Sequence, residues 1–301
     1  MIVAVLGMLV LILDGKTAVM GASQGVMLCI RQVIPSLFPF FLLSGAVIRG
    51  LKGGGSVLGI PGSIWICGFL GGYPMGARSI GQACSAGALS REQGERLLGC
   101  CCNAGPAFFF GMLPALFPEG WMVWTLWAIH VAGALLVWAL SPGEKIRMSP
   151  LPDASGGMQE AVKAMGTVCG WVIFFRVWIA FLSRWAFWAI PLPVQAAVTG
   201  AIELVNGCSA LGYIGDVGLR FILCSGMIGF GGICVAMQTK SVIGGLSMGP
   251  YLRGKLMQTG FSILLAWGVV HRIWGIPGAC FLLFLGLKCS FCSRKTGAVG
   301  V

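Results

Sequence analysis

Residues 96–111 read RLLGCCCNAGPAFFFG, an apolar run that is interrupted in its middle. Apart from Arg96 at its start the run carries no charge, which is typical of a segment in the hydrocarbon of a bilayer. The residues at 103–106 interrupt a helix, because Gly permits unusual φ angles and Pro lacks an amide donor. Irregular backbone at membrane depth is tolerated only where protein or a water-filled cavity surrounds it. The run therefore predicts a broken helix beside an internal cavity.

The composition of the chain excludes a soluble globular protein. Of its 301 residues 57% are hydrophobic and only 10% are charged, and the mean hydropathy is +0.91. Soluble domains carry about 25% charged residues. The net charge of +11 is spread along the chain without a basic arm, which favours contacts with anionic lipid head groups and excludes nucleic-acid binding. We expect an all-α integral membrane protein, a polytopic helical bundle.

Several apolar runs are near the roughly 20 residues that cross a bilayer. Residues 1–13 are continuously apolar and predict an uncleaved anchor, which is followed by an amphipathic stretch and by a second apolar run at 36–48. The further expected spans are 96–117, 121–140, 164–182, 217–236, 256–270 and 274–287.

Two other apolar segments, 57–72 and 185–202, are too short to span and end in irregular sequence. Such segments are typical of re-entrant or discontinuous helices. Breaks are expected at 71–77, 103–106, 206–209 and 229–232, with tight packing through small residues as the alternative for any one glycine cluster. The residues expected to break helices are Gly71, Gly72, Pro74, Gly105, Pro106, Gly229, Gly231 and Gly232.

The order of these parts indicates an internal inverted repeat. Pro61 precedes Gly68 by seven residues, as Pro193 precedes Gly200, and residues 96–111 align without gaps to 220–235. The expected units are an N-terminal anchor and amphipathic segment (1–34), a first repeat (35–141), a polar linker (142–157), a second repeat (158–273), and a last transmembrane helix with a basic tail (274–301).

Four ionisable residues lie in or beside apolar runs, where a charge at the centre costs about 2.5 to 3.5 kcal/mol. They are Arg78, Arg176, Arg220 and Glu203. The arginines either line water or reach an interface, and Glu203 is either a proton or cation site or the partner of one arginine. His130 is expected to pack, although an intramembrane His can also relay protons.

The chain shows no signature of an enzyme. It has two histidines and nine acidic residues, and no nucleophile, zinc-protease or nucleotide-binding pattern. The 13 cysteines are scattered, and Cys289 and Cys292 form a lone CxxC pair without a second pair or a nearby His. We expect no metal and no cofactor. Ser90 and Gln93 have the spacing of a capping box, which predicts a helix start there.

The combination of VIPSLFPFFLLSG (33–45), GGYPMGAR (71–78) and LSREQGERLLGCCCNAGPAFFFG (89–111) resembles the nucleoside recognition (Gate domain) membrane proteins, and within them the YlbJ-type sporulation membrane proteins. The second half adds similar pieces in GAIELVNGCSAL (200–211) and GFGGICVAMQTKS (229–241). The resemblance implies paired Gate domains of inverted topology that move a small solute across a membrane during sporulation, with dipicolinate as the leading solute.

The leading interpretation is a permease for a small anion in a bacterial inner or forespore-associated membrane. A non-transporting membrane scaffold and a transporter of another solute, such as a nucleoside, are the alternatives. Beyond solute and lipid, the sequence leaves a homo-oligomer or sporulation membrane partners open. Lys288, Arg294 and Lys295 follow the last expected span and predict a cytoplasmic C-terminus. The expected substrate-binding residues are Tyr73, Arg78, Asn103, Glu203, Asn206 and Ser225.

Overall fold

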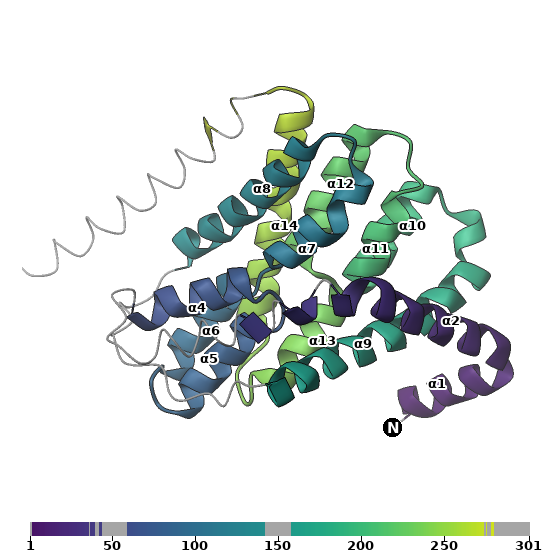
Figure 1. Cartoon of the computed structure of the whole chain (residues 1–301), viewed down its shortest axis with the longest axis horizontal. Helices are drawn as coiled ribbons and strands as arrows, with labels where there is room; N and C mark the ends of the chain where they lie inside the picture. The colour runs from purple at the N-terminus through teal and green to yellow at the C-terminus, as the bar shows by residue number, and fades with distance from the viewer. Residues whose placement is uncertain are drawn as a thin grey trace, which may run out of the picture.

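The computed structural model describes residues 2–35, 37–39, 42–43, 59–141, 158–273, 275 and 278–279, and these residues form helices and no strand. Figure 1 shows the helices packed into one bundle, with the short helix α1 bent away from it. The first half contains α1 (Ile2–Leu13), α2 (Gly15–Leu28), the π-helix η1 (Cys29–Val33), α4 (Gly59–Leu70), α5 (Met75–Ser85), α6 (Arg91–Cys101), α7 (Pro106–Met112), the 3-10 helix η2 (Leu113–Leu116) and α8 (Gly120–Leu140). The second contains α9 (Met158–Trp185), the 3-10 helix η3 (Phe187–Ala189), α10 (Leu192–Ile202), α11 (Leu204–Leu211), α12 (Val217–Phe230), α13 (Gly232–Val242) and α14 (Gly249–Val270).

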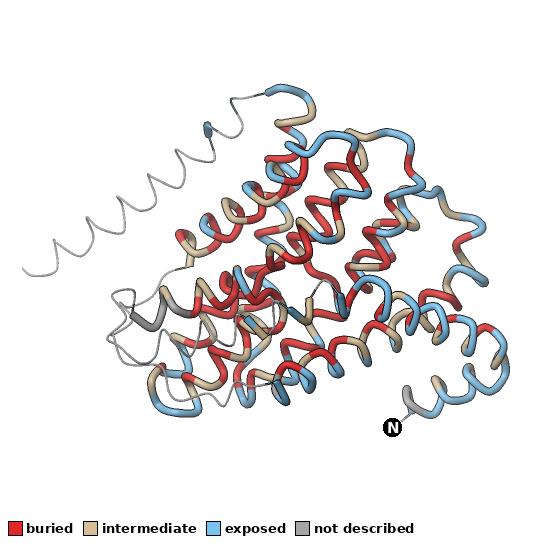
Figure 2. Tube along the Cα trace, viewed as in Figure 1, coloured by how far each residue is buried: buried red, intermediate tan, exposed pale blue. Residues whose placement is uncertain are grey.

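Four segments of the described chain are long and apolar enough to cross a membrane, namely Arg91–Leu116, Gly120–Leu140, Ala161–Trp185 and Val217–Val242. A fifth would be the pair α1 and α2, which is bent by 99°. The span Arg91–Leu116 is 72% buried inside the protein, whereas Ala161–Trp185 is 33% buried. The broken spans therefore form the interior of the bundle, and α9 lies at its edge (Figure 2).

Two helical hairpins flank the broken spans, α4 with α5 and α10 with α11, and Figure 1 shows them on opposite sides of the molecule. Each hairpin is closed by a pair of glycines. A Cβ atom on Gly76 would overlap the carbonyl oxygen of Cys101, as would one on Gly68, and a Cβ atom on Gly207 would overlap the backbone of Gly200. Only glycine permits these approaches. The first pair packs its hairpin against the end of α6, and the second pair packs α10 against α11.

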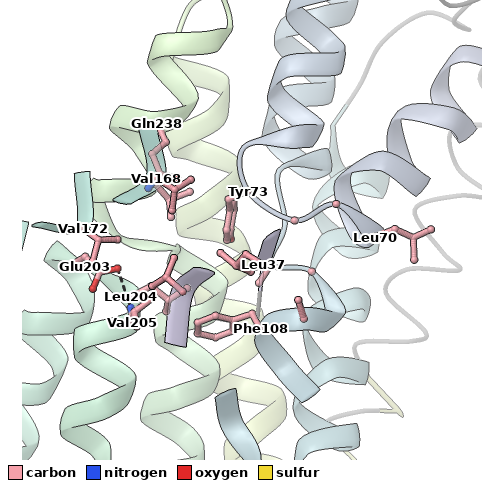
Figure 3. Close-up of a pocket in the computed structure, with 17 residues that line it drawn as sticks. Leu37, Leu70, Tyr73, Phe108, Val168, Val172, Glu203, Leu204, Val205 and Gln238 are labelled. Atoms are coloured by element: carbon pink, nitrogen blue, oxygen red, sulfur yellow. Dashed lines mark hydrogen bonds between the residues drawn. The ribbon is translucent and has the colours of Figure 1, made fainter. Parts of the chain in front are cut away.

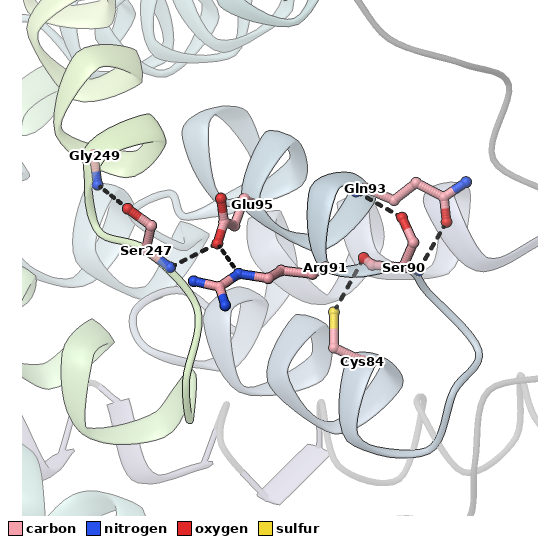
Figure 4. Close-up of polar contacts among 7 residues, drawn as sticks. All are labelled: Cys84, Ser90, Arg91, Gln93, Glu95, Ser247 and Gly249. Carbon is pink, nitrogen blue, oxygen red and sulfur yellow. Dashed lines mark hydrogen bonds and ion pairs between the residues drawn. The ribbon is translucent and has the colours of Figure 1, made fainter.

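The two broken spans run in opposite directions. At one end of the bundle, Glu95 near the start of α6 accepts a hydrogen bond from the amide of Ser247, just beyond α13, over 2.9 Å (Figure 4). At the other end, the guanidinium of Arg220 in the first turn of α12 donates to the carbonyl of Leu116, where the first broken span ends. Each span thus begins where the other finishes.

The start of α6 is capped as the sequence predicts. The amide of Gln93 donates to the Ser90 hydroxyl over 3.2 Å, and the amide of Ser90 donates to the Gln93 side chain over 3.0 Å (Figure 4). This capping box satisfies two amides that have no partner within the helix.

The expected breaks are found with two corrections. The breaks lie at 71–74 and 102–105, at Glu203, and at Gly231, which has a left-handed φ of +82°. Residues 206–209 were expected to break a helix, but they lie inside α11 because the Glu203 side chain caps that helix at its start. Gly229 lies inside α12, where its missing side chain lets α12 approach the backbone of Thr259.

Several sequence-based predictions lie outside the described residues. They are the linker at 142–157, most of the apolar run at 36–48, nearly all of the last span at 274–287, the CxxC pair, and the basic tail that predicts the side of the C-terminus.

Candidate functional site

All four helix breaks meet near the middle of the bundle. A Cβ atom on Gly72, in the first break, would lie 3.0 Å from the amide nitrogen of Gly105 in the second. A Cβ atom on Gly232, beside the fourth break, would lie 3.0 Å from the carbonyl oxygen of Gly200, close to the third. Tyr73 connects the halves, because its hydroxyl lies 3.4 Å from the carbonyl oxygen of Ile228. Because the breaks lie together, several backbone amide and carbonyl groups that have no hydrogen-bond partner within a helix are found in the same region.

A cavity of about 50 Å³ lies where the breaks meet (Figure 3). That volume holds ordered water but is far smaller than the roughly 300 to 1,000 Å³ of a typical ligand pocket. Its walls are largely apolar and come from α7, α9, α11 and α13. The polar and break residues among its walls are Gly71, Gly72, Tyr73, Gly105, Glu203 and Gln238.

Glu203 is buried in one wall of the cavity and is already surrounded by donors. Its carboxylate accepts hydrogen bonds from the amide of Val205 over 3.0 Å, from the amide of Asn206 over 2.7 Å, and from the Asn206 side chain over 2.6 Å. Among the described residues no Arg or Lys lies within ion-pair distance of it. Glu203 therefore caps α11, and the described residues show no ion pair between it and any of the arginines that the sequence offered as a partner.

Lys255 on α14 lies behind Tyr73 and is fully buried, with 0% of its surface exposed. Its ammonium group donates to the Gln258 side-chain oxygen over 2.8 Å and to the Tyr73 hydroxyl over 3.3 Å. The same nitrogen lies 5.2 Å from the centre of the Tyr73 ring, within the range of a cation–π contact. Lys255 thus joins the second half to the first break.

A chain of polar side chains continues from Lys255 to the second break. The Gln258 amide donates to the Asn103 side-chain oxygen over 3.1 Å and to the carbonyl oxygen of His130 over 3.2 Å. The Asn103 amide donates to the carbonyl of Cys100 over 2.8 Å. All three side chains are buried. The network satisfies polar groups in the interior, where an unpaired one would cost about 1 to 3 kcal/mol.

The expected substrate-binding residues are only partly assembled. Tyr73 and Glu203 line the cavity, Asn206 bonds to Glu203, and Asn103 belongs to the polar chain. Ser225 donates to the carbonyl of Ser262 over 3.0 Å, between α12 and α14. Arg78 is half-buried in the first turn of α5 and is not among the residues that line the cavity.

The other two arginines connect helices away from the cavity. Arg176 on α9 donates to the Gln24 side chain on α2 over 2.6 Å. Arg220 donates to the carbonyl oxygen of Ile214 through two nitrogens, over 3.2 and 2.5 Å, in addition to its bond with Leu116. Neither arginine lines the cavity.

The most deeply buried cation among the described residues, Lys255, was not predicted from the sequence. Lys255 precedes the apolar stretch of its helix, so it resembles a residue at a membrane interface. Its signal is spacing: Lys255, Gln258 and Ser262 recur at intervals of three and four and so share one helical face. All three are buried, at 0%, 0% and 1% exposure. A polar stripe in an apolar helix predicts a face turned to the protein interior.

No group of three or more metal-ligating side chains is found in the part of the chain that the structure describes. The ten described cysteines are free thiols, most of them buried. The polar side chains in the cavity wall are the Tyr73 hydroxyl, the Glu203 carboxylate and the Gln238 amide, and the Lys255 ammonium lies behind Tyr73. Such groups suit the binding of a polar solute by hydrogen bonds and charge.

The fold and the site define an all-helical, multi-pass integral membrane protein with discontinuous helices around an internal cavity. The chain is similar to the sporulation integral membrane protein YlbJ of Bacillus subtilis (strain 168), at 24% identity over 323 aligned residues. The alignment covers 85% of this chain and 79% of the relative. No family model matches the chain, and no solved structure matches it.

Proposed function

We propose that this protein is a permease that moves a small anionic solute through the cavity where its four helix breaks meet. The observation that supports the proposal most strongly is the convergence of the breaks on Tyr73, Glu203 and Lys255. Transporters bind solutes at the ends of discontinuous helices, because the freed backbone groups and side chains there can replace hydration.

The arrangement of the halves supports transport by alternating access. We propose that the two halves are an inverted repeat, since each contains a hairpin, a broken span and a further long helix in the same order, and the broken spans run antiparallel. Two equivalent hairpins that enter from opposite ends can open in turn. The cavity volume of about 50 Å³ is too small for a solute of this kind, so we propose that a hairpin moves when the solute enters.

A carboxylate anion is the class of solute that we propose. The buried ammonium of Lys255 has no acidic partner among the described residues, while the one acidic side chain in the cavity wall is saturated by donors. The relative's name associates it with sporulation. On that ground, and by the resemblance to the Gate domain proteins, we propose a role in sporulation, with dipicolinate as the first solute to test.

The alternative function is a membrane scaffold, in which breaks and charges serve packing and partner binding. The cavity at the junction favours transport, because a scaffold needs no internal space where discontinuous helices meet. A nucleoside or another neutral solute is the alternative substrate, and it would leave the charge of Lys255 without a role.

The test is a solute uptake screen with the purified protein in liposomes. The screen compares dipicolinate, other small carboxylates, nucleosides and amino acids. Saturable uptake of a carboxylate supports the proposal, and saturable uptake of a neutral solute alone replaces the substrate class. No uptake of any solute, from vesicles that contain folded protein, favours the scaffold.

A further inference from the structure

Lys255 is a buried cation whose partners are neutral. Its nitrogen contacts the oxygens of Gln258 and Tyr73, and both ion pairs found among the described residues, Arg91–Glu95 and Arg184–Asp14, lie elsewhere. A buried charge is costly unless it is paired and hydrogen-bonded. Such a residue is retained either because the fold needs it or because a bound ligand supplies the negative charge that compensates it.

The packing of α14 explains how the charge is tolerated without an acid. The backbones of Gly254 and Gly99 touch, so Lys255 lies against the last turn of α6, which ends at Cys101. The carbonyl end of a helix carries roughly half a negative charge. This partial charge stabilises the ammonium group incompletely and leaves a net positive site.

Tyr73 separates this positive site from the cavity. The Tyr73 side chain lines the cavity, and its hydroxyl lies between the Lys255 ammonium and the carbonyl of Ile228. The contact with Ile228 is long, at 3.4 Å, and therefore weak. An ammonium group has three donors, and the contacts to Gln258 and Tyr73 use two of them. No third acceptor for this group is found within the part of the chain that the structure describes, so its third donor can serve a ligand that reaches it past Tyr73.

We propose that Lys255 binds a carboxylate of the transported solute, and that Tyr73 covers this site when it is empty. The proposal rests on the proposed function and adds the residue that selects for negative charge. In the loaded state the carboxylate accepts a hydrogen bond from the Lys255 ammonium and a second from the Tyr73 hydroxyl. An uncharged solute would leave the ammonium uncompensated, so the site selects anions.

The decisive variant is Lys255→Met, which keeps most of the side-chain length and removes the charge. If the charge of Lys255 is compensated only when an anion is bound, the neutral variant lacks an uncompensated buried charge. Its solute-free form should then have a higher melting temperature than the wild type. The same variant should weaken dipicolinate uptake by about 10- to 100-fold, the range for one lost hydrogen bond to a charged group. Lys240→Met, on the exposed side of α13, is the matched control and should change neither measurement.

The experiment measures melting temperature and dipicolinate uptake in liposomes for wild type, Lys255→Met, Lys240→Met and Arg78→Gln. A more stable Lys255→Met protein with impaired uptake supports the proposal. Unchanged uptake by Lys255→Met overturns it and leaves the permease intact. Impaired uptake by Arg78→Gln alone also overturns it, and assigns the anion to Arg78.

Two further outcomes are informative. If Lys255→Met does not fold, Lys255→Gln is measured in the same way, and failure of both neutral variants shows that the charge serves the fold and overturns the proposal. If the wild-type protein moves no solute at all, the proposed function fails first, and the Lys255 proposal fails with it.

Discussion

The backbone amide of Ala104 donates to Nε2 of His130 over 3.2 Å, so a side chain of α8 satisfies an amide that the break between α6 and α7 leaves free. His130 is 2% exposed, and its other ring nitrogen lies 3.4 Å from the Gln258 amide. Since Nε2 accepts this hydrogen bond, it carries no hydrogen of its own, and a neutral ring has its hydrogen on Nδ1. His130 is therefore part of the support of the break rather than a packing residue alone.

His130→Leu should destabilise the protein by about 1 to 3 kcal/mol, because it leaves the Ala104 amide buried without an acceptor. The measurement is the thermal unfolding midpoint in detergent. His271→Leu, at the exposed end of α14, is the control and should have little effect. Equal midpoints for the two variants would contradict the role given to His130.

The second prediction concerns the glycines that pack closely against neighbouring backbone, Gly76 and Gly207. Gly76→Ala and Gly207→Ala should each lower the yield of folded protein, since the new Cβ atom overlaps the carbonyl oxygen of Cys101 in the first case and the backbone of Gly200 in the second. Gly166→Ala and Gly170→Ala on α9 are matched controls, because nothing lies within 4 Å of either new Cβ atom. The controls should be neutral or stabilising by up to about 1 kcal/mol, as alanine favours helix over glycine. If all four variants behave alike, close hairpin packing is not what these glycines provide.

Glu203→Gln tests the cap of α11. A carboxylate accepts from all three donors around it, whereas an amide has one oxygen and directs its own hydrogens at donors. We expect a loss of about 1 to 3 kcal/mol in unfolding free energy. Asp216→Asn, at the exposed cap of α12, should be close to neutral because Asn caps helices as well as Asp does. A neutral Glu203→Gln would indicate that Glu203 is protonated or serves another purpose.

The sequence predicts the class of fold well, because apolar length and scarce charge determine where helices can lie. The first two breaks are evident since Gly and Pro cluster there, as in Gly71–Pro74. The third was misplaced because Glu is an uncommon helix cap. Position 203 looks like an isolated intramembrane charge until the structure shows its carboxylate at the start of α11.

The site was harder to predict because it depends on contacts between distant parts of the chain. Tyr73 and Lys255 are 182 positions apart, and α14 reaches the first half of the chain where Gly254 packs against Gly99 on α6. The sequence indicated charged residues near breaks, and it favoured Arg78 by that criterion. Whether a cation is buried depends on which face of its helix is turned to the protein interior. For α14 that face could be predicted from the polar stripe that contains Lys255.

The most direct test of the central claim is dipicolinate uptake by liposomes that contain wild type, Val235→Phe or Val162→Phe. Val235 lines the cavity, whereas Val162 is 53% exposed on the outer face of α9. We predict saturable uptake by wild type and by Val162→Phe, and no uptake by a folded Val235→Phe protein whose cavity is filled. Equal uptake by all three proteins would show that the solute does not pass this cavity, and absence of uptake by wild type would contradict transport of this anion.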